Sequence, residues 1–240
     1  MKRFLLLSIA LIFLSAPALS HQPYFEEKDI TEESAWHIED ATISTAVYST
    51  LETPDDVDYY TFAAASGQDI LLSLTIPQIE GQENFAPTMV LMGPGFPEGP
   101  LTSKVISPKG VGILILPPPD NATEFFEPFS RTSYWTRQEE YIVIPENGTL
   151  TVAVYDQENR IGRYVFVIGD REVPGGDLAF PLKIKRYWTT IEVQGAQNMT
   201  SDQTSETPQP TSPYAQPGFE VLMALNCLAA TAHVLTVRRK

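Results

Sequence analysis

The stretch that decides the fold runs from Asp58 to Ile76 and reads DYYTFAAASGQDILLSLTI. In Asp58 to Ala64, aromatic and polar side chains alternate along the chain. In Asp69 to Ile76, alternate side chains are expected to face opposite sides of the strand. One side would carry Ile70, Leu72, Leu74 and Ile76, and the other side Leu71, Ser73 and Thr75. A period of two predicts half-buried strands. The turn residues Ser66-Gly67-Gln68 predict that the two strands form a hairpin, and Pro77 ends the second strand.

Runs of the same kind lie on both sides of this stretch. The expected strands are Thr42 to Leu51, Thr88 to Met92, Val111 to Leu116, Glu140 to Ile144, Leu150 to Tyr155 and Arg163 to Ile168, with one or two more within Asp177 to Ile191. No stretch of this part of the chain shows helical periodicity over ten residues. About eight short strands separated by turns predict an all-β fold, a single antiparallel β-sandwich of jelly-roll-like type, with a closed barrel as the alternative.

The connecting regions are rich in aromatic residues. The acidic segment from Gln22 to Glu39 contains Tyr24 and Trp36, and we expect it to pack over the domain rather than at its centre. The long section from 78 to 137 is interrupted by Gly and Pro and holds four aromatic side chains, Phe125, Phe126, Tyr134 and Trp135. Two interpretations stay open for these four: they fill a minor core, or they stack on sugar rings.

Residues 1–20 have the three parts of a secretory signal peptide. Lys2 and Arg3 are followed by the apolar run from Phe4 to Leu14 and then by small residues. Cleavage after Ala18 or after Ser20 fits the pattern, and the second choice makes His21 the new N-terminus. An uncleaved membrane anchor fits less well, because the apolar run is short.

The other end of the chain has the features of an anchor. Residues 194–216 are rich in Ser, Thr, Pro and Gln, which predicts an extended stalk after a folded body at 21–193. Residues 217–240 contain an apolar run from Phe219 to Val237 that is close to the roughly 20 residues of a transmembrane helix. The basic residues at 238–240 would stay on the cytoplasmic side and place the body outside.

The tail resembles a known sorting signal. A Ser/Thr-rich stalk, the tripeptide Pro217-Gly218-Phe219, an apolar helix and a basic end resemble the PGF-CTERM signal of archaeal surface proteins. The resemblance implies that an archaeosortase-like enzyme recognises Pro217, Gly218 and Phe219, removes the helix and joins the new C-terminus to a membrane lipid. This tail departs from the pattern in its polar residues Asn226 and His233.

Charge and cysteine content exclude several classes of function. The formal net charge is −14, and the two ends of the chain are both basic, so the body is more acidic still. Such a surface disfavours nucleic-acid binding. The single cysteine, Cys227, lies in the tail, so the body has no disulfide, no thiolate zinc site and no cysteine nucleophile. Three sequons, at Asn121, Asn147 and Asn198, are candidate glycosylation sites of an extracellular glycoprotein.

A second resemblance concerns the body. The residues Asp56, Asp58, Tyr60 and Phe62, followed by Gly67, are similar to the D-x-D-x-Y-x-F…G motif of pre-peptidase C-terminal-like sandwich domains. The resemblance implies a non-catalytic module of a secreted protein. In physical terms, Asp58 would brace the turn that enters the strand, and Tyr60 and Phe62 would fill the core.

Two metal sites are candidates. Asp55, Asp56 and Asp58 offer carboxylate oxygens at a loop spacing that suits Ca²⁺, although acidic turns without a metal are common. If the mature chain begins at His21, the amino group and imidazole of that residue could chelate Cu(II) as a histidine brace, with His37 as a third ligand. The alternative interpretation makes both histidines ordinary surface residues.

The sequence contains no G-x-S-x-G motif and no phosphate-binding glycine loop, and three histidines are too few for most triads. We therefore expect a non-enzyme: an anchored β-sandwich of the cell envelope or an adhesion-type module that binds an unknown surface ligand. The alternatives are a surface protein that binds Ca²⁺ or copper, and a glycan-binding or glycan-acting protein, since two carboxylates in a cleft could cleave glycosides.

Overall fold

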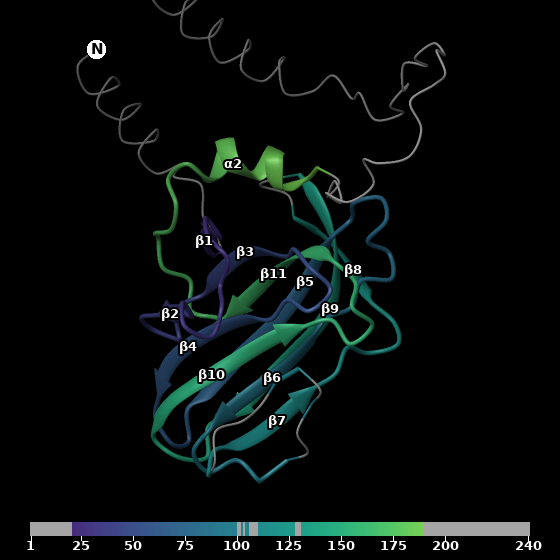
Figure 1. The fold of residues 1–240 in the computed structure, drawn as a ribbon. Helices are drawn as coiled ribbons and strands as arrows, with labels where there is room; N and C mark the ends of the chain where they lie inside the picture. The colour runs from purple at the N-terminus through teal and green to yellow at the C-terminus, as the bar shows by residue number, and fades with distance from the viewer. Residues whose placement is uncertain (1–20, 100–101, 103, 106–109, 128–130, 190–240) are drawn as a thin grey trace, which may run out of the picture. The chain divides into compact units, whose positions relative to one another are not determined.

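The computed structural model describes residues 21–99, 102, 104–105, 110–127 and 131–189. Within these residues, two β-sheets pack face to face, with one short helix (Figure 1). The six-stranded sheet has the order β1 (Gln22–Phe25), β3 (Thr45–Leu51), β11 (Gly162–Ile168), β5 (Asp69–Pro77), β9 (Thr132–Val143) and β8 (Thr123–Glu127). The five-stranded sheet has the order β2 (Trp36–Ile38), β4 (Asp58–Ala64), β10 (Gly148–Tyr155), β6 (Thr88–Gly93) and β7 (Gly112–Leu116). The expected two-sheet, mostly β sandwich is confirmed.

The pairing of strands differs from the prediction in two ways. β4 and β5 lie in different sheets, so they do not form the expected hairpin. The turn between them, in which Gly67 has a φ of 80°, carries the chain across the sandwich instead. The sandwich is also not purely antiparallel, because β1 runs parallel to β3 and β2 runs parallel to β4. A period of two shows that a strand has one buried face, and it says nothing about which strand lies beside it.

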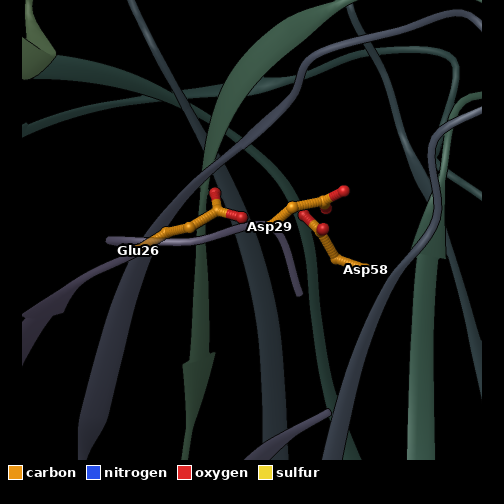
Figure 2. A group of neighbouring side chains, drawn as sticks. All are labelled: Glu26, Asp29 and Asp58. Atoms are coloured by element: carbon orange, nitrogen blue, oxygen red, sulfur yellow. The ribbon is translucent and has the colours of Figure 1, made fainter. Parts of the chain in front are cut away.

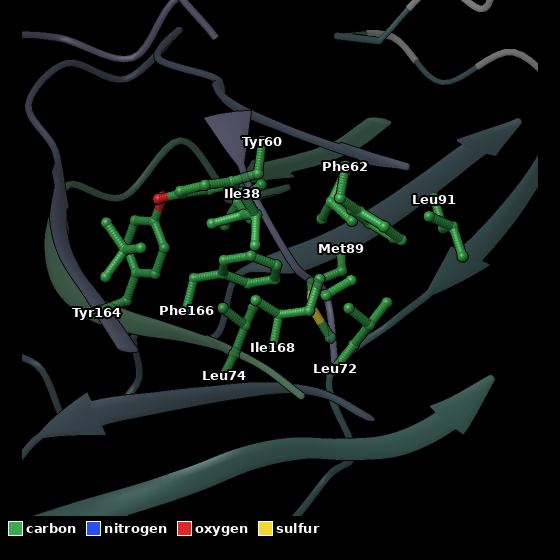
Figure 3. Close-up of a cluster of buried hydrophobic side chains, with 14 of the residues drawn as sticks. Ile38, Tyr60, Phe62, Leu72, Leu74, Met89, Leu91, Tyr164, Phe166 and Ile168 are labelled. Atoms are coloured by element: carbon green, nitrogen blue, oxygen red, sulfur yellow. The ribbon is translucent and has the colours of Figure 1, made fainter. Parts of the chain in front are cut away.

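The main core lies between the two sheets. The alternating row of β5, Ile70, Leu72, Leu74 and Ile76, is at most 1% exposed. From the opposite sheet, Tyr60 and Phe62 of β4 are fully buried, and the Tyr60 ring stacks on Phe166 at a centroid distance of 4.3 Å (Figure 3). Burial of each such side chain contributes about 1.5–3 kcal/mol. The stretch from Asp58 to Ile76 therefore supplies both walls of the core.

The expectation of strands within Asp177 to Ile191 is wrong. The chain forms helix α2 (Phe180–Tyr187) there, with Pro181 in the first turn, where a missing N–H leaves no helical hydrogen bond unmade. Phe180, Ile184 and Tyr187 form the buried face of α2 and pack on the outer face of the six-stranded sheet against Phe25, Tyr48, Val165 and Val167. Because both faces of β3 and β11 are covered, nearly all residues of these two strands are buried.

Several predictions fall outside the described residues. These are the signal peptide at 1–20, the stalk, the tail with Pro217, Gly218 and Phe219, and the sequon at Asn198. Within the described part, no helix is both long and apolar enough to cross a membrane. Asn121 and Asn147 are exposed residues next to strand ends, where a glycan could be accommodated.

Candidate metal centre

The candidate centre forms where the N-terminal segment crosses from one sheet to the other. Just after β1, the backbone N–H of Glu26 donates to the carbonyl of Tyr48 in β3, at 3.0 Å. Four residues later, the carbonyl of Ile30 accepts from the N–H of Tyr59 in β4, also at 3.0 Å. The segment between these two bonds spans the end of the sandwich. It carries Glu26 and Asp29 to the first residue of β4, Asp58.

Three carboxylates meet at this point. One oxygen of each of Glu26, Asp29 and Asp58 lies within 4.8 Å of the other two (Figure 2). Asp58 is 0% exposed, Glu26 is half-buried and Asp29 faces solvent. The group is therefore closed on the side of the core and open on the side of the solvent.

The hydrogen bonds of the two inner carboxylates are incomplete. Glu26 Oε2 accepts from the N–H of Thr50 at 2.8 Å, and Asp58 Oδ2 accepts from the Tyr164 hydroxyl. Their other oxygens, Glu26 Oε1 and Asp58 Oδ1, are buried and have no hydrogen-bond partner within the described residues. An unpartnered buried oxygen is costly, especially on a charged group.

A buried chain of hydroxyls leads from Asp58 into the core. The Tyr164 hydroxyl lies 2.8 Å from that of Tyr60, which lies 2.8 Å from the Ser49 hydroxyl. Because Tyr164 donates its only hydroxyl proton to Asp58, Tyr60 donates to Tyr164 and Ser49 donates to Tyr60. Helix α2 is tied to the same chain, since the Tyr187 hydroxyl donates to the carbonyl of Ser49 at 3.1 Å and also contacts the carbonyl of Tyr164. The chain is therefore oriented to stabilise a negative charge on Asp58.

Burial and mutual repulsion raise the pKa values of Glu26 and Asp58, the two inner carboxyls of the group. Burial raises the pKa of Asp58 to about 9, with the nearby Glu26 carboxylate as the second cause. Burial likewise raises the pKa of Glu26 to about 8, opposed by the hydrogen bond from the Thr50 N–H. The pKa of Asp56 is raised by burial to a smaller degree. Without a cation, the group holds protons at pH 7 that ordinary carboxyls would have lost.

The donor set suits a hard cation. Ca²⁺ takes carboxylate, carbonyl and water oxygens at 2.3–2.6 Å, so two oxygens bound to one ion lie at most about 5 Å apart. The 4.8 Å span of the three carboxylate oxygens falls within that limit. Two of the buried oxygens without a partner in the described residues, Glu26 Oε1 and Asp58 Oδ1, belong to this group, so a cation could satisfy them.

Of the three aspartates predicted from sequence as calcium ligands, the structure places only one in the candidate centre. Asp58 belongs to the three-carboxylate group, but Asp55 and Asp56 do not. Asp56 Oδ2 instead accepts from the N–H of Glu52 at 2.6 Å, and Asp55 is exposed. Sequence reasoning missed Glu26 and Asp29, which lie about thirty residues upstream in a segment expected to be peripheral. Their only local signal is the acidic run Glu26-Glu27-Lys28-Asp29 after a strand-like segment, which many sequences share.

The two histidines of the copper hypothesis lie on different sheets. His21 precedes β1, and its Nδ1 lies 2.5 Å from the Ser44 hydroxyl; burial lowers its pKa. His37 lies on β2, exposed, with Nδ1 3.3 Å from the Thr61 hydroxyl. In the part of the chain that the structure describes, neither histidine joins a group of three or more metal-binding side chains. The copper brace stays a prediction that requires a mature chain beginning at His21.

The four central aromatics are also divided. Phe125 and Phe126 lie on β8, at 45% and 56% exposure. Tyr134 and Trp135 lie on the neighbouring strand β9, where Tyr134 is buried and Trp135 is half-buried. Tyr134 and Trp135 pack against the core, as one of the two interpretations expected. Phe125 and Phe126 are exposed, so the sugar-stacking interpretation stays open for them.

Comparison with known proteins yields only distant likenesses. No family model matches the chain, and no curated protein matches it significantly. Among solved structures, the chain is similar to the pre-peptidase C-terminal domain of collagenase from Bacillus anthracis, with 17% identity, a TM-score of 0.32, and coverage of 56% of this chain and 93% of that one.

Two further likenesses are to copper proteins. CorA, a surface-associated copper-binding protein of Methylomicrobium album BG8, is 7% identical, with a TM-score of 0.31 and coverage of 63% of this chain and 99% of that one. MopE, a secreted protein of Methylococcus capsulatus in which an oxidised tryptophan facilitates copper binding, is 14% identical, with a TM-score of 0.22 and coverage of 48% and 70%. All three TM-scores are below 0.5, so no conclusion about function rests on them.

Proposed function

We propose that this chain is an exported, non-catalytic β-sandwich of the cell surface that binds Ca²⁺ through Glu26, Asp29 and Asp58. The observation that carries the calcium site is the Oδ1 atom of Asp58. It belongs to a fully buried carboxylate, has no hydrogen-bond partner within the described residues, and lies in a group with two further carboxylates (Figure 2).

A cation bound at the site would cross-link the N-terminal segment to the sandwich. Glu26 and Asp29 belong to the segment that crosses between the sheets, while Asp58 begins β4. A bound cation would offset the repulsion among the carboxylates and hold the segment on the body. Calcium sites of extracellular modules have dissociation constants of about 10⁻⁴–10⁻³ M, which matches the calcium supply outside cells.

Thermal unfolding of the purified protein, in EDTA and in CaCl₂, tests the site. With a dissociation constant near 10⁻⁴ M, 10 mM Ca²⁺ should raise the melting temperature by about 5–10 °C. The effect should be smaller with Mg²⁺, which requires a stricter octahedral geometry. Asp58→Asn and Asp29→Asn should both abolish the calcium response.

Asp55→Asn is the matched control, because Asp55 lies in the same acidic turn but outside the group. It should respond to calcium as the wild type does. No shift in the wild type, or an equal loss of response in Asp55→Asn, would reject the site. Asp29 is exposed, so its substitution remains informative even if the buried Asp58→Asn variant does not fold.

The proposed location rests on the ends of the chain. The signal-like residues 1–20 would export the body, the stalk at 194–216 would extend it from the surface, and the tail at 217–240 would anchor it at the outer face of the membrane. We include the archaeosortase-like processing at Pro217-Gly218-Phe219 and the lipid anchor in the proposal. The favoured role is an envelope or adhesion-type module with a surface ligand.

Mass spectrometry of the protein from membranes of the producing cell tests this part independently of calcium. We expect a new N-terminus after Ala18 or Ser20, and a C-terminus near residue 217 that carries the added mass of a lipid. An intact residue 240 would mean that the tail is kept as an ordinary transmembrane anchor. A mature N-terminus at any residue other than His21 would remove the copper brace.

A further inference from the structure

A groove lies between β1 and β2, the edge strands of the two sheets, away from the oxygens of the metal centre. It encloses about 380 Å³, and its lining includes Tyr24 of β1 together with Trp36, His37, Glu39 and Asp40 on and after β2. This volume falls within the range of about 300–1,000 Å³ that is usual for small-ligand sites. The groove forms because β1 and β2 extend different sheets and are joined by the segment that crosses the end of the sandwich.

One wall of the groove is aromatic. The rings of Tyr24 and Trp36 lie with their centroids 6.0 Å apart and their planes tilted by 57°, so together they form a corner. Both side chains are half-buried. Within the described residues, no hydrogen bond is made by the indole N–H of Trp36. The corner presents the rings of Tyr24 and Trp36 to the groove.

The polar groups of the groove fall into two sets. The first set is occupied: Tyr24 donates its hydroxyl proton to Gln22 Oε1 at 3.2 Å, and Gln22 Nε2 donates to the carbonyl of Val173 at 3.3 Å. Asp40 accepts from the N–H and hydroxyl of Thr42 at 2.9 and 2.6 Å, and from Arg171 at 2.9 Å. These bonds hold the walls in place before any ligand binds, which lowers the cost of ordering them on binding.

The second set is available. Glu39 is exposed, and its carboxylate has no hydrogen-bond or ion-pair partner in the part of the chain that the structure describes. His37 is exposed on the outer face of the five-stranded sheet, where its Nδ1 lies 3.3 Å from the Thr61 hydroxyl, so its imidazole points away from the Trp36 ring. The planar carboxylate of Glu39 can accept hydrogen bonds from two hydroxyl groups at once.

From this arrangement we infer that the groove binds a neutral saccharide. One pyranose ring stacks its C–H face on the Trp36 ring against the Tyr24 edge, while Glu39 accepts hydrogen bonds from its hydroxyls. Among the described residues, the lining of the groove includes the carboxylates of Glu39 and Asp40 but no Lys or Arg, and Arg171 is paired with Asp40. That charge balance disfavours uronic and sialic acids and favours neutral hexoses. The groove shares no residue with Glu26, Asp29 and Asp58, so the inference does not rest on calcium binding.

The test is a titration of the purified full-length protein with neutral and acidic oligosaccharides, preceded by a glycan array to choose the probes. We expect measurable binding of at least one neutral oligosaccharide in both EDTA and Ca²⁺. Trp36→Ala should weaken that binding by about tenfold or more, because it removes the stacking surface. Glu39→Gln should weaken it less. Trp36→Phe keeps a ring and should retain most of the affinity, which guards against a Trp36→Ala variant that fails to fold.

Phe126→Ala is the matched control, because it removes the most exposed aromatic ring of the competing platform on β8. It should bind as the wild type does. If Phe126→Ala abolishes binding and Trp36→Ala does not, the saccharide site lies on β8 and the inference is wrong. It is also overturned if the folded wild type binds no neutral saccharide, or binds acidic ones more tightly than neutral ones.

Discussion

Asp58 and Asp40 are two carboxylates held beside the same N-terminal segment, and their surroundings are opposite. Asp58 is fully buried, one of its oxygens has no partner within the described residues, and burial raises its pKa to about 9. Asp40 is only partly buried, with its side chain 44% exposed in the ion pair with Arg171, and both of its oxygens accept hydrogen bonds. Its pKa is lowered, mainly because the Thr42 hydroxyl and N–H donate to it.

The difference shows how two chemically identical groups acquire different roles. The bonds of Asp40 are complete, so it positions the loop at the groove and needs nothing further. The bonds of Asp58 are incomplete, so at neutral pH it needs either a proton or a cation. A buried carboxylate oxygen without a hydrogen-bond partner indicates a ligand more strongly than an exposed carboxylate whose hydrogen bonds are complete. For this reason we place the metal centre at Asp58.

The largest expected effect is on the pH dependence of stability in EDTA. The folded chain keeps protons on Asp58 up to about pH 9 and on Glu26 up to about pH 8, whereas the unfolded chain loses them near the ordinary values of 3.8 and 4.5. Between about pH 5 and 9 the folded state therefore binds more protons, and its free energy of unfolding should fall by several kcal/mol as the pH rises. Asp58→Asn should reduce this fall markedly, as measured by urea unfolding at a series of pH values.

Calcium supplies the control for that measurement. At saturating Ca²⁺ the folded state no longer needs the protons, so the fall in stability with pH should flatten. A wild-type protein whose metal-free stability does not change between pH 6 and 9 would show that Asp58 is ionised without a cation, and the contrast with Asp40 would then fail.

A smaller effect is expected from the hydroxyl chain that supports Asp58. Tyr164→Phe removes the donor to Asp58 Oδ2 and the acceptor of the Tyr60 hydroxyl, and should lower the free energy of unfolding by about 1–3 kcal/mol at pH 7. Much of this loss should disappear when the substitution is made in Asp58→Asn, so a double-mutant cycle should show coupling. Additive losses would mean that Tyr164 supports the core and not the carboxylate.

The smallest effect is expected at Asp40. Asp40→Asn should lower the free energy of unfolding by less than about 1 kcal/mol at pH 7, because the ion pair with Arg171 is exposed and screened. Since the folded pKa of Asp40 is lowered, its contribution is present above the ordinary value of 3.8 and is lost in stronger acid. Wild type and Asp40→Asn should therefore converge at low pH in guanidinium unfolding. A loss of unfolding free energy comparable with that of Tyr164→Phe would show that Asp40 stabilises more of the fold than its own loop.

The central strands were predictable from sequence, whereas β1, β2, β8 and the part of β9 before Glu140 were missed, and the metal centre was predictable only in part. β4 has the predicted bounds Asp58–Ala64, and β5 differs by the single residue Pro77. Asp58 could be singled out because it opens a strand within an acidic turn. Glu26 and Asp29 could not, because nothing local distinguishes them from the many exposed acids of this chain. Helix α2 was missed because its buried residues, Phe180, Ile184 and Tyr187, cover only two turns and also fit a short aromatic strand.

By itself, the sequence determined the strands with clear alternation, such as β4 and β5, and which face of each of them is buried. Alternation can be read from neighbouring residues alone. Because Ile70, Leu72, Leu74 and Ile76 lie on one face of the strand, they are removed from water only when that face is buried. Tertiary structure alone decided which strands pair, that β4 and β5 face each other across the core, and that Glu26 and Asp29 meet Asp58. Those outcomes depend on the packing of whole sheets and on contacts between residues far apart in the chain. Burial then turned one aspartate of the stretch from Asp58 to Ile76 into a candidate metal ligand.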